Sequence, residues 1–208
     1  MILLNHCLVQ SARPIKILAT DKNEGSRIGG NRPEGITPAR VDLNTRYFAT
    51  VDLDELSQCE ISIFVNLRYD WDNPNSLYRQ VSRIFSTEEF VQLVVHQKSK
   101  RSKSTDLASE LPGRALVIDK ETADMITEPG GELLVPNKIG GRPYFFYNEP
   151  NYITSVTNLI DQGFNLFLQL SWGGYEREVP FAWPFDQYTF HLLARQTPEG
   201  IEWRYGWG

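Results

Sequence analysis

Short stretches in which apolar residues alternate with polar ones, or follow one another, predict strands along much of the chain. The clearest is residues 60–67, where apolar side chains at every second position share one face of an extended chain. Further strands are predicted at residues 46–53, 164–170, 187–194 and 201–205. Apolar runs at residues 2–9 and 15–18, interrupted by Pro14, are consistent with a strand or an edge element.

Three other stretches have helical spacing. Residues 86–89 read as a capping box, and Phe90, Leu93 and Val94 follow at intervals that predict a helix closed by His96. Residues 75–85 and 152–162 also carry apolar residues on one helical face. Gly163 is placed where a helix C-cap is expected.

One motif occurs twice. Residues 26–30 read Ser-Arg-Ile-Gly-Gly and residues 137–141 read Asn-Lys-Ile-Gly-Gly, with Arg-Pro shortly after each. We expect the glycines to permit positive φ and close approach of the chain, because the pattern of a phosphate-binding loop is missing. These structural glycines are Gly29, Gly30, Gly140 and Gly141.

Each glycine pair is followed by a strand, a connection and another strand, which predicts internal repeats at about residues 26–67 and 137–194. A helical and basic-loop segment at about residues 75–110 separates them, and its basic residues 98–104 are expected to form a solvated linker. The predicted fold is α+β, sheet-rich and largely antiparallel. Its two pseudo-symmetric repeats would pack as one globular unit, a single domain over residues 1–208, with a few flanking helices.

Composition narrows the class of protein. Apolar residues make up 41% of the chain and charged residues 23%, as in ordinary folded domains. A net charge of −5 argues against duplex nucleic-acid binding and suits a basic partner. Cys7 and Cys59 do not form a disulfide or zinc pattern, and no signal peptide or membrane-spanning run is evident. We therefore expect a cytoplasmic protein without cofactor or metal, bound neither to nucleic acid nor to membrane.

The paired order of these motifs resembles the YwqG-like family of bacterial proteins, a family of unknown function. The resemblance rests on the glycine-pair motif at residues 26–30 with Pro-Glu-Gly at 33–35, on strands 48–53 and 63–65, and on residues 138–143 and 166–170. It implies an internally duplicated, sheet-rich fold in bacterial cytoplasmic proteins, some of them encoded near toxin and secretion loci where immunity proteins occur. Acidic residues usual in that family are replaced around Ser171 and Trp183, and the family supplies no catalytic residues to transfer.

Residues capable of catalysis are dispersed. The histidines His6, His96 and His191 lie in three separate predicted elements, where a structural role is favoured over a catalytic one. Acidic residues cluster at 52–55 and at Asp70 and Asp72, where the spacing suits a hard cation but a turn is favoured. Neither a hydrolase elbow nor a zinc motif is present.

The most distinctive candidate surface is the long connection at residues 172–186, which mixes large aromatic side chains with glutamates and prolines. Exposed aromatics beside charges often serve recognition, although the rings could equally cover one end of the core. The candidate partner-binding residues are Trp172, Tyr175, Glu176, Glu178 and Trp183.

Three functions remain open. The first is a protein-binding module, specifically an immunity protein that neutralises a bacterial toxin by direct binding, as in toxin-antitoxin systems; acidic side chains would steer it to a basic partner. The second is an enzyme with a dispersed acidic site that includes Asp52, Asp70 and Asp72. The third is a small-molecule or glycan binder that uses the aromatic connection. The first is the prediction, with no catalytic residues assigned.

Overall fold

The computed structural model describes residues 11–20, 23–42, 45–52, 58–66, 91–109, 111–124, 137–145, 150–171 and 189–207. Its contacts divide the chain into two compact units. One unit comprises Leu18–Leu116 and is called the middle unit below. The other comprises Met1–Ile17 with Val117–Gly208 and is called the terminal unit.

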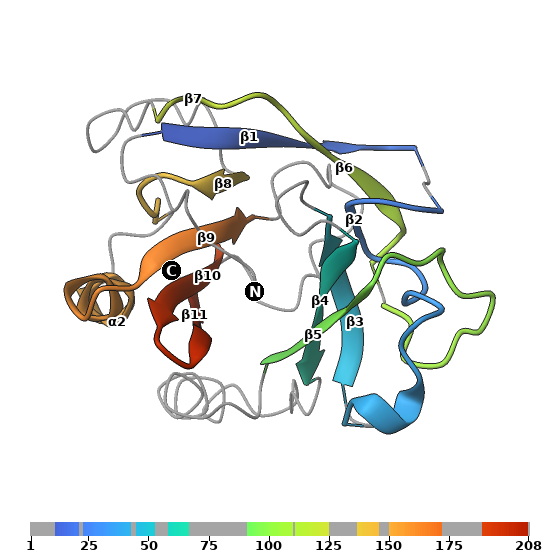
Figure 1. Cartoon of the computed structure of the whole chain (residues 1–208). Helices are drawn as coiled ribbons and strands as arrows, with labels where there is room; N and C mark the ends of the chain where they lie inside the picture. The colour runs from blue at the N-terminus through green and yellow to red at the C-terminus, as the bar shows by residue number, and fades with distance from the viewer. Residues whose placement is uncertain are drawn as a thin grey trace. The chain divides into compact units, whose positions relative to one another are not determined.

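The middle unit contains an antiparallel sheet in the order β6-β2-β3-β4-β5 (Figure 1). Its strands are β2 (Arg27–Ile28), β3 (Thr45–Val51), β4 (Cys59–Asn66), β5 (Val91–Gln97) and β6 (Arg114–Ile118). A 3-10 helix, η1 (Pro38–Arg40), lies between β2 and β3 in the sequence. The apolar core on one face of this sheet comprises Ile36, Val41, Tyr47, Phe64, Val94 and Leu107.

The terminal unit contains a second antiparallel series, β11-β10-β9-β8-β1, with β7 also paired to β1 (Figure 1). Its elements are β1 (Ser11–Leu18), β7 (Thr122–Ala123), β8 (Lys138–Gly140), α2 (Pro150–Asp161), β9 (Asn165–Leu170), β10 (Phe190–Thr197) and β11 (Gly200–Trp207). Helix α2 packs against this sheet, where Val156 meets Phe164 and Leu193.

The end of α2 shows how the sequence fixes the step from helix to strand. The amide of Gly163 donates to the carbonyl of Ile160, and the amide of Phe164 donates to that of Leu159. This pattern is a Schellman motif, and it requires the positive φ of 87° that Gly163 adopts. The expected C-cap is confirmed. No helix in the described ranges combines the length and apolar character needed to cross a membrane.

The predicted α+β fold with a few flanking helices is wrong. The regular secondary structure of the described residues is nearly all antiparallel sheet, and α2 is the one α-helix among them. The strands predicted at residues 46–53, 60–67, 164–170, 187–194 and 201–205 are present as β3, β4, β9, β10 and β11, with shifted ends. The predicted strand at residues 2–9 and helix at 75–85 lie outside the described residues.

The helix predicted after residues 86–89 is also wrong where it can be compared. Residues 91–97 form strand β5, and all seven pair with β4. Three β-branched valines in this run favour the extended chain, and pairing with a neighbouring strand outweighs the local helical spacing. His96 therefore lies within a strand and does not close a helix.

Candidate functional site

The two glycine-pair motifs have the same backbone geometry. Gly29 and Gly30 have φ values of 70° and 69°, and Gly140 and Gly141 have 73° and 76°. At Gly29 a Cβ atom would collide with the backbone carbonyl oxygens of Leu111 and Pro112. Glycine is therefore required here both for its backbone angle and for lack of space.

The motifs also correspond in hydrogen bonding. Ser26 Oγ accepts the amide of Asp52, the first residue after β3, at 2.8 Å. Asn137 Oδ1 accepts the amide of Ser171, the first residue after β9, at 2.6 Å. The polar residue at the start of each motif thus caps the end of the strand beside it.

Register and bulges extend the correspondence. Arg27 pairs with Thr50 of β3, and Lys138 pairs with Gln169 of β9. Strand β3 has one extra residue, Phe48, in its pairing with β4, two residues before Thr50. Strand β9 has one extra residue, Phe167, in its pairing with β10, two residues before Gln169. The two units therefore share a backbone plan from the glycine pair through the following two strands.

Each motif also places a cation inside its unit. Arg27 is fully buried, and its Nη1 donates to Gly25 O at 2.6 Å while Nη2 donates to Ser99 O at 3.3 Å. Nη2 lies 3.5 Å from Glu60 Oε1, which also accepts the amide of Ser99 at 3.1 Å. Burial raises the pKa of Glu60, and the charge of Arg27 opposes that shift.

A chain of hydroxyls runs beside this pair. Tyr47 Oη, Thr50 Oγ1, Ser62 Oγ and His96 Nε2 are joined in that order by contacts of 2.8 Å. Because Nδ1 of His96 is 2.8 Å from the Gln97 carbonyl, it carries the proton and Nε2 accepts from Ser62. Burial lowers the pKa of His96 and raises that of Tyr47 to about 12, so the ring stays neutral and the phenol protonated.

The contact between Ser62 and His96 has the residue types of a nucleophile and its base. Ser62 is fully buried, however, and its oxygen is already engaged by Thr50. A substrate cannot reach that oxygen in this arrangement. The chain of hydroxyls therefore acts as a structural connection across β3, β4 and β5.

The terminal unit has a different buried pair. Lys138 Nζ is 2.8 Å from Asp124 Oδ1, and both side chains are almost fully buried. Asp124 Oδ2 also accepts the amide of Arg142 at 2.6 Å. Burial lowers the pKa of Lys138, and Asp124 opposes that shift. In β10, the His191 ring lies 2.9 Å from the Tyr144 carbonyl, and burial lowers its pKa to about 4.

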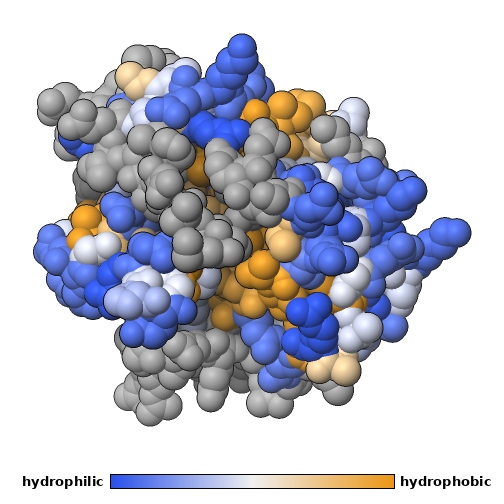
Figure 2. Space-filling model, in the orientation of Figure 1, coloured by the Kyte–Doolittle hydropathy of each residue, from blue (hydrophilic) through white to orange (hydrophobic). Residues whose placement is uncertain are grey.

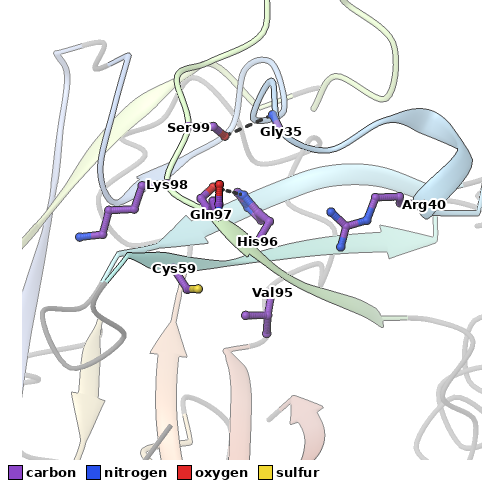
Figure 3. Close-up of a pocket in the computed structure, with 8 residues that line it drawn as sticks. All are labelled: Gly35, Arg40, Cys59, Val95, His96, Gln97, Lys98 and Ser99. Atoms are coloured by element: carbon purple, nitrogen blue, oxygen red, sulfur yellow. Dashed lines mark hydrogen bonds between the residues drawn. The ribbon is translucent and has the colours of Figure 1, made fainter. Parts of the chain in front are cut away.

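A hollow of about 560 Å³ opens at the end of β5 in the middle unit. Figure 3 shows Cys59 and Val95 on one side of the sheet, with His96 and Gly35 on the other. The lining is Gly35, Arg40, Cys59, Val95, His96, Gln97, Lys98 and Ser99. Two of these residues are cations, and none is acidic.

Some of the candidate site residues predicted from the sequence are described by the structure, and others are not. Asp52 Oδ1 forms an ion pair with Lys98 Nζ at 2.5 Å, at the rim of the hollow. His96 and His191 lie in β5 and β10, in the structural contacts given above. Among the described residues no group of acidic, histidine or cysteine side chains could hold a metal ion. The other predicted positions, His6, Cys7, Asp70, Asp72 and all five partner-binding residues, lie outside the described residues.

The basic residues 98–104 are in part packed, which the prediction of a solvated linker missed. Arg101 forms a bridge with Pro33, and the amide of Ser102 donates to Arg32 O. The sequence reasoning also missed the buried ions Arg27, Glu60, Lys138 and Asp124. One signal was available: each glycine-pair motif has a cation at its second position, next to an isoleucine in a two- or three-residue strand.

Comparisons with known proteins assign no family to this chain. The resemblance to the YwqG-like family stays an expectation. No protein-family model, curated protein or solved structure matches the chain.

Proposed function

We propose that this chain is a protein-binding module, and specifically an immunity protein that neutralises a bacterial toxin in the cytoplasm by direct binding. In this proposal the chain supplies a rigid β scaffold and a recognition surface, and it carries out no reaction. Nucleic acid and membrane have no part in it.

A scaffold role is supported by the contacts of the side chains that could otherwise act in catalysis. Asp52 is in an ion pair with Lys98, and His96 and His191 each contact a main-chain carbonyl inside the fold. Depressed pKa values keep both rings neutral near pH 7. These three candidate residues are thus engaged in contacts within the fold.

The chemistry of the partner follows from charge. With a net charge of −5, the chain is attracted to a basic surface, such as the active site of a nuclease-type toxin. The aromatic connection at residues 172–186 combines Glu176 and Glu178 with large rings, which are the residue types that dominate binding energy at interfaces. We assign partner binding to that connection.

The test uses the protein encoded beside this chain, which the proposal expects to be the toxin. The two proteins are co-expressed, growth rescue is scored, and the affinity of the purified pair is measured by calorimetry. Wild type should restore growth, and E176K/E178K should weaken binding by at least about tenfold.

A matched control carries the same change of net charge elsewhere. Glu34 and Glu199 are exposed, and E34K/E199K should bind the toxin nearly as wild type does. If wild type fails to rescue growth and does not bind the toxin, the immunity function is wrong. If both double variants lose affinity equally, only net charge matters and the assignment to residues 172–186 is wrong.

A further inference from the structure

Strand β5 is the last strand of its sheet in the order formed by the described residues. The Lys98 amide donates to the Gln58 carbonyl at 2.9 Å, immediately beyond the paired residues Cys59 and Gln97. Hydrogen-bonded pairs alternate along an antiparallel ladder, so the main-chain groups of Val94 and His96 face β4. Those of Leu93 and Val95 therefore face away from β4, toward the edge.

The residues of β5 have none of the sequence features that usually protect an edge strand against pairing. Natural edge strands are kept from pairing by lysine, proline, a bulge or short length. The seven residues of β5 read Val-Gln-Leu-Val-Val-His-Gln, with no charge or proline, and their register with β4 has no irregularity. Val95 is 41% exposed, and Figure 2 shows hydrophobic atoms at the surface where Figure 1 draws β4 and β5.

The hollow described above lies along the second half of this edge. It is lined by the consecutive residues 95–99, which are the last three residues of β5 and the two that follow it, and by Gly35 and Arg40 (Figure 3). A space that reaches both faces of a terminal strand has the form required by an added strand, whose side chains also alternate.

The positive charge of the residues that line the hollow favours an added strand with acidic side chains. Arg40 is exposed, and within the described residues its guanidinium has no ion pair. Lys98 is the second cation of the lining, and its side chain is 40% exposed beside Asp52. Because no acidic side chain lines the hollow and Asp52 at its rim is paired with Lys98, a carboxylate near Arg40 would be attracted by that guanidinium.

We propose that β5 is a docking edge for an extended acidic segment of a partner protein. The segment adds as a strand, bonds to the outward main-chain groups of Leu93 and Val95, and places a carboxylate against Arg40. The docking edge and the aromatic connection at residues 172–186 are different segments of the chain, and the inference does not depend on the toxin assignment.

The probe is a fluorescein-labelled octapeptide of alternating valine and glutamate, titrated with the full chain and followed by fluorescence anisotropy. Two matched peptides separate the contributions: one has lysine in place of glutamate, and one has N-methyl groups on alternate amides. Both should bind at least about tenfold more weakly than the probe, through lost charge pairing and lost strand pairing respectively.

Two variants locate the site on the protein. Val95→Pro removes an outward amide while leaving the pairs with β4 intact, and it should weaken probe binding at least about tenfold. Arg40→Glu should weaken the glutamate peptide and strengthen the lysine peptide. The control is Ile201→Pro in β11, the terminal strand of the other series, which should leave binding unchanged.

Several results would overturn the proposal. These are absence of probe binding, equal binding of the glutamate and lysine peptides, or insensitivity to Arg40→Glu, an exposed change that does not threaten folding. Self-association of wild type in sedimentation that Val95→Pro abolishes would assign the edge to a second copy of the chain instead. The E176K/E178K variant should still bind the probe, so failure of this inference and failure of the toxin proposal are distinguishable.

Discussion

The two glycine-pair motifs share a backbone but not a charge arrangement. Both have glycines with φ near 70°, a polar cap on the adjacent strand and a one-residue bulge at the corresponding place. In the middle unit the buried cation is an arginine that contacts two carbonyls and a glutamate. In the terminal unit it is a lysine held by one aspartate. The backbone path is therefore the constant part of the motif, whereas each unit neutralises its buried cation with different partners.

The largest expected loss of stability comes from breaking the buried ion pair of the terminal unit. Lys138→Met leaves Asp124 buried without its cation and should reduce the free energy of unfolding by about 3–5 kcal/mol. In K138M/D124N the buried charge is gone and the amide oxygen can still accept from Arg142, so much of that loss should be recovered. Urea denaturation of the single and double variants measures the coupling.

The corresponding cycle in the middle unit should recover little. Arg27→Met removes the donors to the carbonyls of Gly25 and Ser99 as well as the partner of Glu60. Adding Glu60→Gln removes the unpaired charge but does not replace those donors. Equal recovery in the two cycles would show that the two buried cations are energetically equivalent, contrary to the comparison.

The second prediction concerns the shared backbone. Gly29→Ala should destabilise the protein by about 3 kcal/mol, because the new Cβ meets main-chain carbonyls and the positive φ is strained. The control is Gly25→Ala, which has a φ of 77° but no close neighbour, and which should cost about 1 kcal/mol. Similar losses in thermal and urea unfolding for both variants would mean that space at Gly29 is not limiting.

The third prediction uses His191, which has no histidine counterpart in the middle unit because Ser62 occupies the corresponding register position. Its pKa of about 4 in the fold lies below the ordinary value, so the unfolded chain binds more protons between these pKa values. Lowering the pH from about 7 to 5 should therefore remove on the order of 2 kcal/mol of stability through this residue.

The measurement is the free energy of unfolding against pH, for wild type and for His191→Gln. Glutamine can still donate to the Tyr144 carbonyl but does not titrate. The variant should show the shallower slope in this pH window, and equal slopes would contradict the assignment.

The smallest effect is expected in the hydroxyl chain of the middle unit. Thr50→Val keeps the shape of the side chain but breaks the contacts to Tyr47 and Ser62, which should cost about 1–2 kcal/mol. Thr105→Val at an exposed position of the loop is a matched control that should change stability little. A Thr50→Val variant as stable as wild type would show that the chain of hydroxyls contributes nothing to the fold.

The sequence was sufficient to predict β3, β4 and β9 because their apolar residues recur in patterns that require few distant contacts to interpret. It was misleading for β5, where Phe90, Leu93 and Val94 have helical spacing but the run is paired along its whole length with β4. Spacing reports what a segment can do alone, whereas pairing depends on partners that are 26 to 38 residues away in the sequence, from Val65↔Val91 to Cys59↔Gln97.

The buried polar positions were harder still. Alternation in residues 60–67 suggests that Glu60 and Ser62 face water, yet both are fully buried with partners in β2, β3 and β5. A strand covered on both faces gives the same alternating pattern as one with a wet face, provided that its polar side chains find partners. Those partners become visible only when strands from distant parts of the chain are aligned.

The buried polar side chains have a consequence for how uniquely the sheet can form. Apolar strands tolerate a slip of two residues, because each side chain then still faces the same layer. In the middle unit such a slip between β4 and β5 would move His96 away from Ser62 and from Glu60, and it would leave several buried polar atoms without partners. Alternative alignments are therefore penalised, and the polar layer selects one register among several that hydrophobic burial alone would accept.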